Sequence, residues 1–281
     1  MFRFTSLIAS RRKTVALSLV ALFAAGLTAE AQVSVLSSTV EEHTGGPGEK
    51  YAGRIEIANS SRTAQVVRLY QTDYTFAADG TSNFDRAGST ARSNSAWISL
   101  QSEQVTVPPT SSISVPYTVA IPRTDSLRGT YWSAIMVEPV EHPTPTVAKD
   151  GEKPHVGLGT VIRYAVQVST HIGTSGTRTV KFDHIDAKQG PDSAGATKSM
   201  LGLDVINAGE RAYRPALWIE LYDAQGALRA KAKQSRGLLY PGCSLRQRFD
   251  LGVIPPGTYK AVIFADTGEE TVYASQYTVV F

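Results

Sequence analysis

The phrase Gly-Thr-Tyr occurs twice in this chain, at 129–131 and at 257–259, and each copy opens a similar run of residues. An Ile-Pro pair lies upstream of each copy, and the distance from that pair to the phrase differs between them. A short phrase that recurs with its surroundings, with only the loops resized, is typical of a duplicated supersecondary unit. The sequence therefore predicts two related domains in tandem.

Short runs rich in Val, Ile, Tyr and Thr follow one another along the chain, and clusters of Gly, Pro, Asn, Asp and Ser separate them. Such runs are predicted to be strands joined by turns, and no long window after the first thirty residues shows a helical stripe of apolar residues. Many short strands with regular turn signals favour β-sandwiches over a parallel sheet. The predicted strands are 51–58, 65–70, 112–119, 131–137, 160–169, 200–206, 216–222, 245–251, 259–265 and 271–281.

The turn residues support the same interpretation. Asn59 and Asn207 each begin a polar turn directly after a predicted strand, and the pairs 79–80 (Asp-Gly) and 225–226 (Gln-Gly) follow the next strand of each half, as hairpin turns would. We expect the two halves to meet at a short joint of small residues, 172–176.

The two tyrosines of the repeated phrase, Tyr131 and Tyr259, fit a known device of immunoglobulin-like sandwiches. There, a Tyr near the start of strand F bonds back to the preceding corner, two residues before an inward position that antibody domains fill with Cys. Here that position holds Ser133 in the first half and Ala261 in the second. We predict a tyrosine corner in each half, without a cross-sheet disulfide; the alternative is a plain turn that enters a strand.

The first residues have the pattern of a secretory signal peptide. Four basic residues precede or flank an apolar stretch at 15–27, which ends in the small-x-small sequence 29–31. We predict cleavage before Gln32, so that residues 1–31 are removed and the mature chain is periplasmic or extracellular. The alternative is a membrane anchor, but the apolar stretch is shorter than the roughly 20 residues that span a bilayer.

Removal of residues 1–31 makes the chain electrically neutral. The whole sequence has 28 basic and 25 acidic residues, and the mature part keeps 24 of each. Because nucleic acids and anionic membranes bind basic faces, neither is an expected partner, and no membrane insertion is expected after cleavage. The remaining 250 residues suit two domains of common size, predicted at 32–172 and 173–281.

The sequence contains no group of residues that we interpret as an active site. The five histidines lack metal-ligand spacing, and no nucleophile elbow, phosphate-binding loop or dinucleotide glycine pattern occurs. We therefore expect no enzyme activity, no catalytic residue, no metal and no cofactor. Cys243 is the only cysteine, so an intramolecular disulfide is impossible; the thiol is either a small buried residue or free to pair between molecules.

The candidate binding site is the predicted strand 160–169. It follows a long polar segment, 138–159, which we predict to be the F–G loop of the first sandwich. One face of the strand carries four large side chains at a spacing of two residues. This ladder either forms the inward core face of strand G or is shared with a strand that a partner adds. Its residues are Ile162, Tyr164, Val166 and Val168.

Taken together, this layout resembles the periplasmic chaperones of pilus and fimbrial subunits, and the segments 97–99, 105–109 and 113–115 are similar to the C–D–E region of their first domain. The resemblance implies binding of partner polypeptides by strand addition. It also implies two basic residues, on the first strand and the G strand, that hold the carboxylate at the partner's C-terminus. Here the first strand, 33–39, has no basic residue, and the G strand has only Arg163, near its start.

A second class of function stays open from the sequence: a structural subunit of a larger cell-envelope or surface assembly. The C-terminal strand would then present exposed aromatic side chains, because an exposed aromatic cluster marks an interface. The aromatic residues of that strand are Tyr273, Tyr277 and Phe281.

Overall fold

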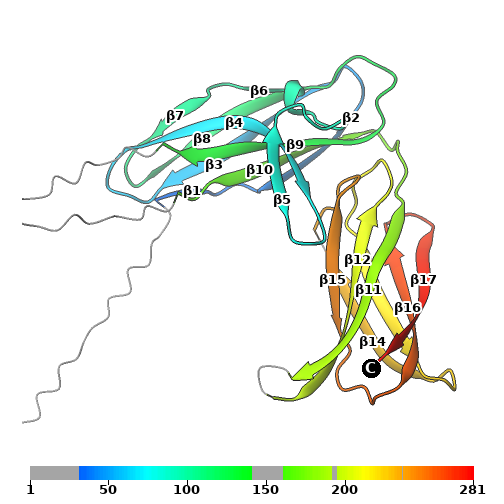
Figure 1. The fold of residues 1–281 in the computed structure, drawn as a ribbon. Helices are drawn as coiled ribbons and strands as arrows, with labels where there is room; N and C mark the ends of the chain where they lie inside the picture. Colours follow the sequence, from blue (N-terminus) through cyan, green and yellow to red (C-terminus); the bar gives the residue numbers. More distant parts are fainter. Residues whose placement is uncertain (1–31, 141–160, 192–194, 236) are drawn as a thin grey trace, which may run out of the picture. The chain divides into compact units, whose positions relative to one another are not determined.

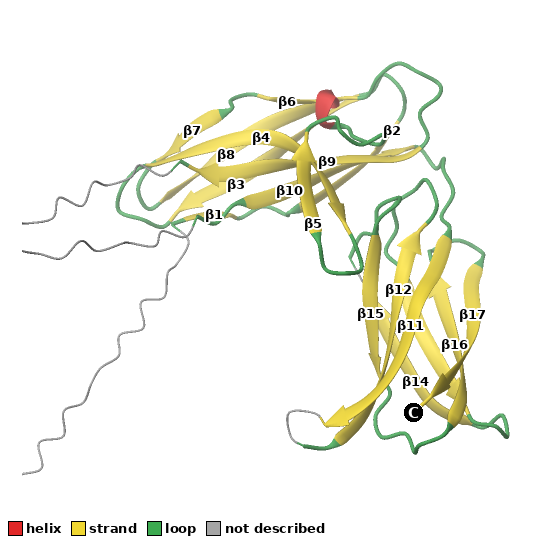
Figure 2. Cartoon of the chain, in the orientation of Figure 1, coloured by secondary structure: helices red, strands yellow, loops and turns green. Residues whose placement is uncertain are grey.

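The computed structural model describes residues 32–140, 161–191, 195–235 and 237–281. Strands make up nearly all of its regular structure, and the single helical element of the described residues is one 3₁₀ turn, η1 (Ser95–Trp97) (Figures 1 and 2). The strands form four sheets, which pair into two β-sandwiches. The predicted fold class, two immunoglobulin-like β-sandwiches in tandem, is confirmed. The predicted signal peptide at 1–31 lies outside the described residues, as does most of the predicted F–G loop.

The first sandwich consists of one sheet in the order β1-β3-β8-β6 and a second in the order β2-β10-β9-β4-β5, with β7 also paired to β4. Its strands run from blue to green in Figure 1. They are β1 (Val33–Val35), β2 (Val40–Gly45), β3 (Lys50–Asn59), β4 (Gln65–Phe76), β5 (Ser82–Arg86), β6 (Ile98–Leu100), β7 (Gln104–Val107), β8 (Ser111–Ala120), β9 (Gly129–Pro139) and β10 (Tyr164–Ile172).

Alternation along the strands builds the core of this sandwich. In β8, the side chains of Val115, Tyr117 and Val119 are buried, while the residues between them are exposed. Ile57 on β3 and Leu69 on β4 bring fully buried side chains to the same cluster, one from each sheet. Since successive side chains of a strand point to opposite faces, one apolar face per strand is enough to fill the space between two sheets.

The second sandwich pairs a sheet in the order β11-β12-β15 with one in the order β14-β13-β16-β17. Among the described residues, no strand of one sandwich pairs with a strand of the other. Its strands are β11 (Val180–Pro191), β12 (Thr197–Asn207), β13 (Ala216–Tyr222), β14 (Leu228–Ser235), β15 (Ser244–Asp250), β16 (Thr258–Asp266) and β17 (Val272–Val280). We propose that the boundary between the two domains lies between residues 172 and 173.

The two polar turns that begin with asparagine are built in the same way. Asn59 and Asn207 are buried at the ends of β3 and β12, and the side-chain oxygen of each accepts the backbone N–H two residues on, at 2.9 Å. Each side-chain amide also donates to the carbonyl four residues on and to one from another segment, Val107 O or Leu239 O. The predicted correspondence between these turns therefore extends to their hydrogen bonds.

The repeated Gly-Thr-Tyr phrase does not have the same role in the two halves. The Tyr259 hydroxyl donates to Pro255 O at 2.8 Å, which is the predicted tyrosine corner. Tyr131 makes no such bond to the described residues; its ring lies 4.9 Å from that of Trp97. The prediction for Tyr131 is therefore wrong. Eight positions separate Ile121 from Gly129, whereas only three separate the matching residues of the second half, so the corner carbonyl lies too far back along the chain.

The glycine of the first copy is required for another reason. Gly129 has a positive φ of 75°, and a Cβ built there would lie 2.0 Å from the carbonyl oxygen of Glu210. Only glycine accepts both that backbone conformation and that close approach.

We expect Tyr259→Phe to lower the free energy of unfolding by about 1 kcal/mol, because it removes one hydrogen bond and keeps the buried ring. Tyr131→Phe, the matched control, should change it by much less. Urea unfolding of both variants measures the difference, and equal losses would contradict the assignment of a single corner.

Candidate functional site

The predicted ladder divides in the structure into a buried part and an outer part. Val166 and Val168 lie in β10 and are 0% and 1% exposed, within the core of the first sandwich. Tyr164, the first residue of β10, is half-buried against the same core. Ile162 precedes the strand and is 41% exposed, so the strand begins later than predicted. Only the N-terminal end of the ladder is therefore accessible.

The same end of β10 has an open backbone edge. β9 pairs with β10 along its whole length, but on the other side β2 pairs in parallel only from Gln167 onward. The Gln167 N–H donates to Thr39 O at 2.9 Å, the first bond on that side. Because backbone groups point to the same side at every second residue, those of Ala165 face the edge that no described strand covers.

Residues of the second half cover the part of this sheet's outer face around Trp132, Gln167 and Ser169. Trp132 on β9 is 4% exposed, and its ring stacks on that of Tyr240 with centroids 4.7 Å apart. Its indole N–H donates to Tyr74 O at 2.6 Å. The Tyr240 hydroxyl bonds with Ser169 at 2.8 Å and donates to Gln167 at 2.9 Å. Burial raises the pKa of Tyr240, so its hydroxyl stays protonated. This part of the face is thus a packed contact and not a free surface.

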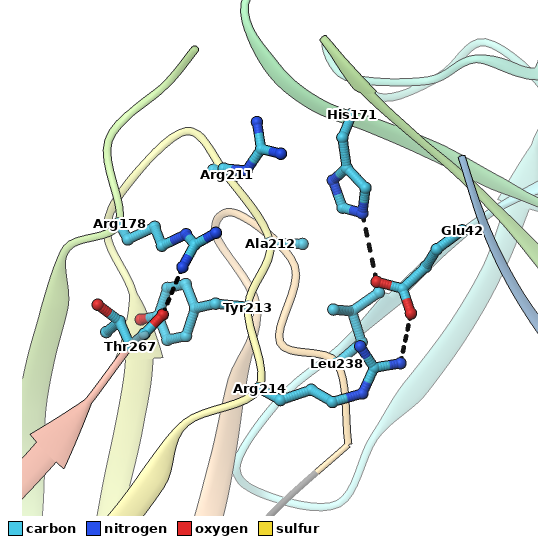
Figure 3. A pocket seen from close by; sticks show the side chains of 9 residues that line it. All are labelled: Glu42, His171, Arg178, Arg211, Ala212, Tyr213, Arg214, Leu238 and Thr267. Carbon is cyan, nitrogen blue, oxygen red and sulfur yellow. Dashed lines mark hydrogen bonds and ion pairs between the residues drawn. The ribbon is translucent and has the colours of Figure 1, made fainter. Parts of the chain in front are cut away.

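A polar cavity of about 170 Å³ lies at the end of β10 (Figure 3). β2 and β10 each contribute one lining residue, and loops of the second half contribute the others. The Thr130 side chain connects these segments, because its hydroxyl oxygen accepts the Ala212 N–H at 2.9 Å. The lining residues are Glu42, His171, Arg178, Arg211, Ala212, Tyr213, Arg214, Leu238 and Thr267.

An ion pair closes one side of this cavity. The Glu42 carboxylate is bound to Arg214 and lies 3.3 Å from His171 Nε2, as the dashed lines in Figure 3 show. Burial raises the pKa of Glu42, but the hydrogen bonds from Arg214 and His171 outweigh it, so the pKa is below its ordinary value. Burial lowers the pKa of His171. The neutral ring then carries its proton on Nε2, and its Nδ1 accepts from the Thr130 hydroxyl at 2.8 Å.

Of the two basic residues that the family resemblance implies, one is absent from the described first strand, and Arg163 does not line this cavity. β1 has no basic residue, and Arg163 precedes β10, where its charge acts on Tyr70 and Glu138. The cavity's guanidinium groups all come from the second half of the chain. Sequence reasoning missed Arg178, Arg211 and Arg214, since single arginines in polar loops carry no signal that separates them from solvated ones.

The aromatic side chains of the C-terminal strand do not form an exposed cluster. Tyr273, Tyr277 and Phe281 are half-buried and pack against the core of the second sandwich. The Tyr273 hydroxyl donates to Arg178 O at 2.7 Å. An exposed aromatic cluster on this strand would have favoured a structural subunit, and the strand has none.

Cys243 is 2% exposed in the same core, and burial raises the pKa of its thiol. It is thus a small buried residue, the first of the two predicted alternatives. Among the described residues, no three His, Cys, Asp or Glu side chains gather as a possible metal site. In the same part of the chain, no helix has the length and apolar character needed to cross a membrane.

Comparison with models of protein families and with curated proteins gave no match. Among solved structures, the chain is similar to the class 5 fimbriae chaperone CfaA, with 12% identity over 87% of this chain and 98% of that one, at a TM-score of 0.44. It is also similar to a chain of the complex between SafA pilin and the SafB chaperone of Salmonella enterica, with 11% identity, 89% and 97% coverage and a TM-score of 0.39.

A third similar structure is the CsuC–CsuE complex of a chaperone and a tip adhesion subunit from archaic chaperone-usher Csu pili of Acinetobacter baumannii. Its identity is 10%, over 88% of this chain and 98% of that one, and its TM-score is 0.39. These structures contain proteins of the kind that the sequence resembles.

Proposed function

We propose that this chain is an exported protein-binding protein, similar to a periplasmic pilus-assembly chaperone, which captures a partner polypeptide by strand addition at the N-terminal end of β10. The observation that carries the proposal is the edge at Tyr164–Val166, which no described strand covers and which two exposed apolar residues precede, with Arg163 between them and the edge. Val161 and Ile162 are 42% and 41% exposed there. An uncovered edge beside apolar side chains is where an extended segment of another chain can add.

Binding at this edge would have two components. The backbone N–H and C=O of Ala165, and of Arg163 if the strand extends, would pair with the added strand and supply affinity without sequence preference. The side chains of Ile162 and Tyr164 alternate along the chain with Arg163 and Ala165. They would contact grooves between the partner's side chains and so select the partner. Full burial of one such side chain contributes about 1.5–3 kcal/mol. Val166 and Val168 would support this edge from within the core.

The proposal includes the periplasm as the location, after removal of residues 1–31, and a polypeptide with an unpaired strand as the partner. It includes no catalytic step, cofactor or nucleic acid. The 24 basic and 24 acidic residues of the predicted mature chain support the expectation that nucleic acid is no partner.

We expect Ile162→Asp to abolish capture of the partner while the protein stays folded, because the side chain is exposed and lies outside the strand. Val253→Asp is the matched control: Val253 is 75% exposed in the second sandwich and lies outside any strand, and its substitution should leave capture intact. The measurement is photocrosslinking in the producing cell from residue 162 and from residue 253, followed by hydrogen exchange on the isolated complex.

Strand addition predicts crosslinks from 162 only, and slowed exchange of the amide of Ala165 in the complex. A complex that forms equally well with Ile162→Asp, or that leaves this amide exchanging as in the free protein, would rule out the proposed edge.

A further inference from the structure

The cavity of Figure 3 contains more positive than negative charge. Three guanidinium groups and one carboxylate line it, and that carboxylate, Glu42, is already bound to Arg214. The two remaining guanidinium groups belong to Arg178, which forms an ion pair with Glu269 outside the lining at 3.5 Å, and to Arg211. His171, which also faces the cavity, contributes no negative charge in either protonation state.

Arg211 is buried without a carboxylate partner. The residue is 9% exposed, and its Nη1 donates to two backbone carbonyls, Gly173 O at 2.8 Å and Ser175 O at 3.1 Å. No carboxylate of the described residues lies within ion-pair distance of its guanidinium. Burial lowers its pKa and the charge of Arg178 lowers it further, while the carboxylate of Glu269 opposes both without outweighing them. A buried charge without a counter-ion is costly, so an anion at this point would stabilise it.

Arg178 and Thr267 add hydrogen-bonding capacity that the protein itself does not use. Arg178 Nη1 donates to Thr267 O at 2.6 Å, while its Nε lies 3.5 Å from a Glu269 oxygen without a hydrogen bond. The Thr267 hydroxyl oxygen is buried and has no partner. Of the three buried side-chain polar atoms that lack a hydrogen bond in the described residues, two therefore belong to residues that line this cavity.

We propose that this cavity binds a small oxyanion, a phosphate or a carboxylate group, between Arg178 and Arg211, with the Thr267 hydroxyl as a further donor. A guanidinium presents N–H groups in a fixed fork that matches the oxygens of either group. The volume of about 170 Å³ is adequate, since a protein cavity of about 150 Å³ accepts a molecule as large as benzene. The site uses no residue of the open β10 edge, so it does not depend on the proposed function.

The test is titration of the mature protein with sodium phosphate and with sodium acetate, at constant ionic strength set by chloride, followed by thermal unfolding and calorimetry. We expect a saturable rise in Tm with at least one of the two anions, because a ligand that binds only the folded state stabilises it. A rise with phosphate alone indicates an inorganic anion or phosphoryl group as the natural ligand, and a rise with acetate indicates a carboxylate.

Arg211→Gln should weaken the affinity for the effective anion at least tenfold, and Arg178→Gln should do the same. Arg54→Gln is the control for loss of one positive charge, since the Arg54 side chain is 76% exposed on β3, and it should bind as the parent does. If Arg211→Gln does not fold, Arg178→Gln and Thr267→Val decide the question. Equal affinity in these variants and the parent, or no saturable effect of either anion, would overturn the proposal.

Discussion

We expect Val168→Asp to unfold the first sandwich and not merely to weaken a binding surface. The side chain is 1% exposed, and its strand lies between β9 and β2, with Ser133 and Glu41 as its register partners. An aspartate there would be a buried charge with no basic partner, or would bind a proton at a cost. Unpaired buried charges cost about 3–5 kcal/mol, and the total stability of a domain is only about 5–15 kcal/mol.

Circular dichroism and urea unfolding of Val168→Asp, with Ile162→Asp as the matched substitution on the same ladder, measure this expectation. The free energy of unfolding of Ile162→Asp should lie within about 0.5 kcal/mol of the parent's, as is usual for substitutions at exposed positions. A folded and stable Val168→Asp would show instead that the core is open at this position, and would extend the accessible ladder beyond Tyr164.

We also expect Trp132→Ala to lower the free energy of unfolding by about 3–5 kcal/mol, the usual cost of removing a buried tryptophan. Trp132 belongs to β9 of the first sandwich, yet its side chain lies in the buried cluster of the second, stacked on Tyr240. The substitution also leaves the Tyr74 carbonyl without its indole donor. Because the lost contacts join the two halves, their thermal transitions should separate.

Differential scanning calorimetry tests this, with Trp218→Ala as the control. Trp218 is half-buried on β13 and stacks on Phe264 at 4.9 Å, within a single sheet, so its loss should cost less and should not separate the transitions. A single transition at the parent temperature in Trp132→Ala would mean that the stack contributes little to holding the halves together.

The strands predicted from the sequence are those whose alternation is clear. β13 was predicted with its observed bounds, and most other predicted strands agree to within a few residues. The strands that were not predicted are at sheet edges or largely exposed: every residue of β5 is exposed, and β14 alternates alanine with basic residues. An edge strand buries little on either face, so it carries little hydrophobic periodicity, and its pairing is decided by its neighbour.

The ladder of β10 shows what the alternation of side chains along a strand can predict and what it cannot. The spacing of two residues established that Ile162, Tyr164, Val166 and Val168 share a face, but not what covers that face. The opposite sheet covers Val166 and Val168, and it does not reach Ile162.

The sequence by itself determined the all-β class, the tandem arrangement and the asparagine turns, because each depends on the preferences of residues close together in the chain. Only the tertiary structure decided which end of β10 has an open edge and which arginines share a cavity. Arg178, Arg211 and Thr267 come from three separate loops, and His171 comes from a strand. These side chains come close together only after the sheets have packed. The local sequence around each of them gives no sign that they will share a cavity.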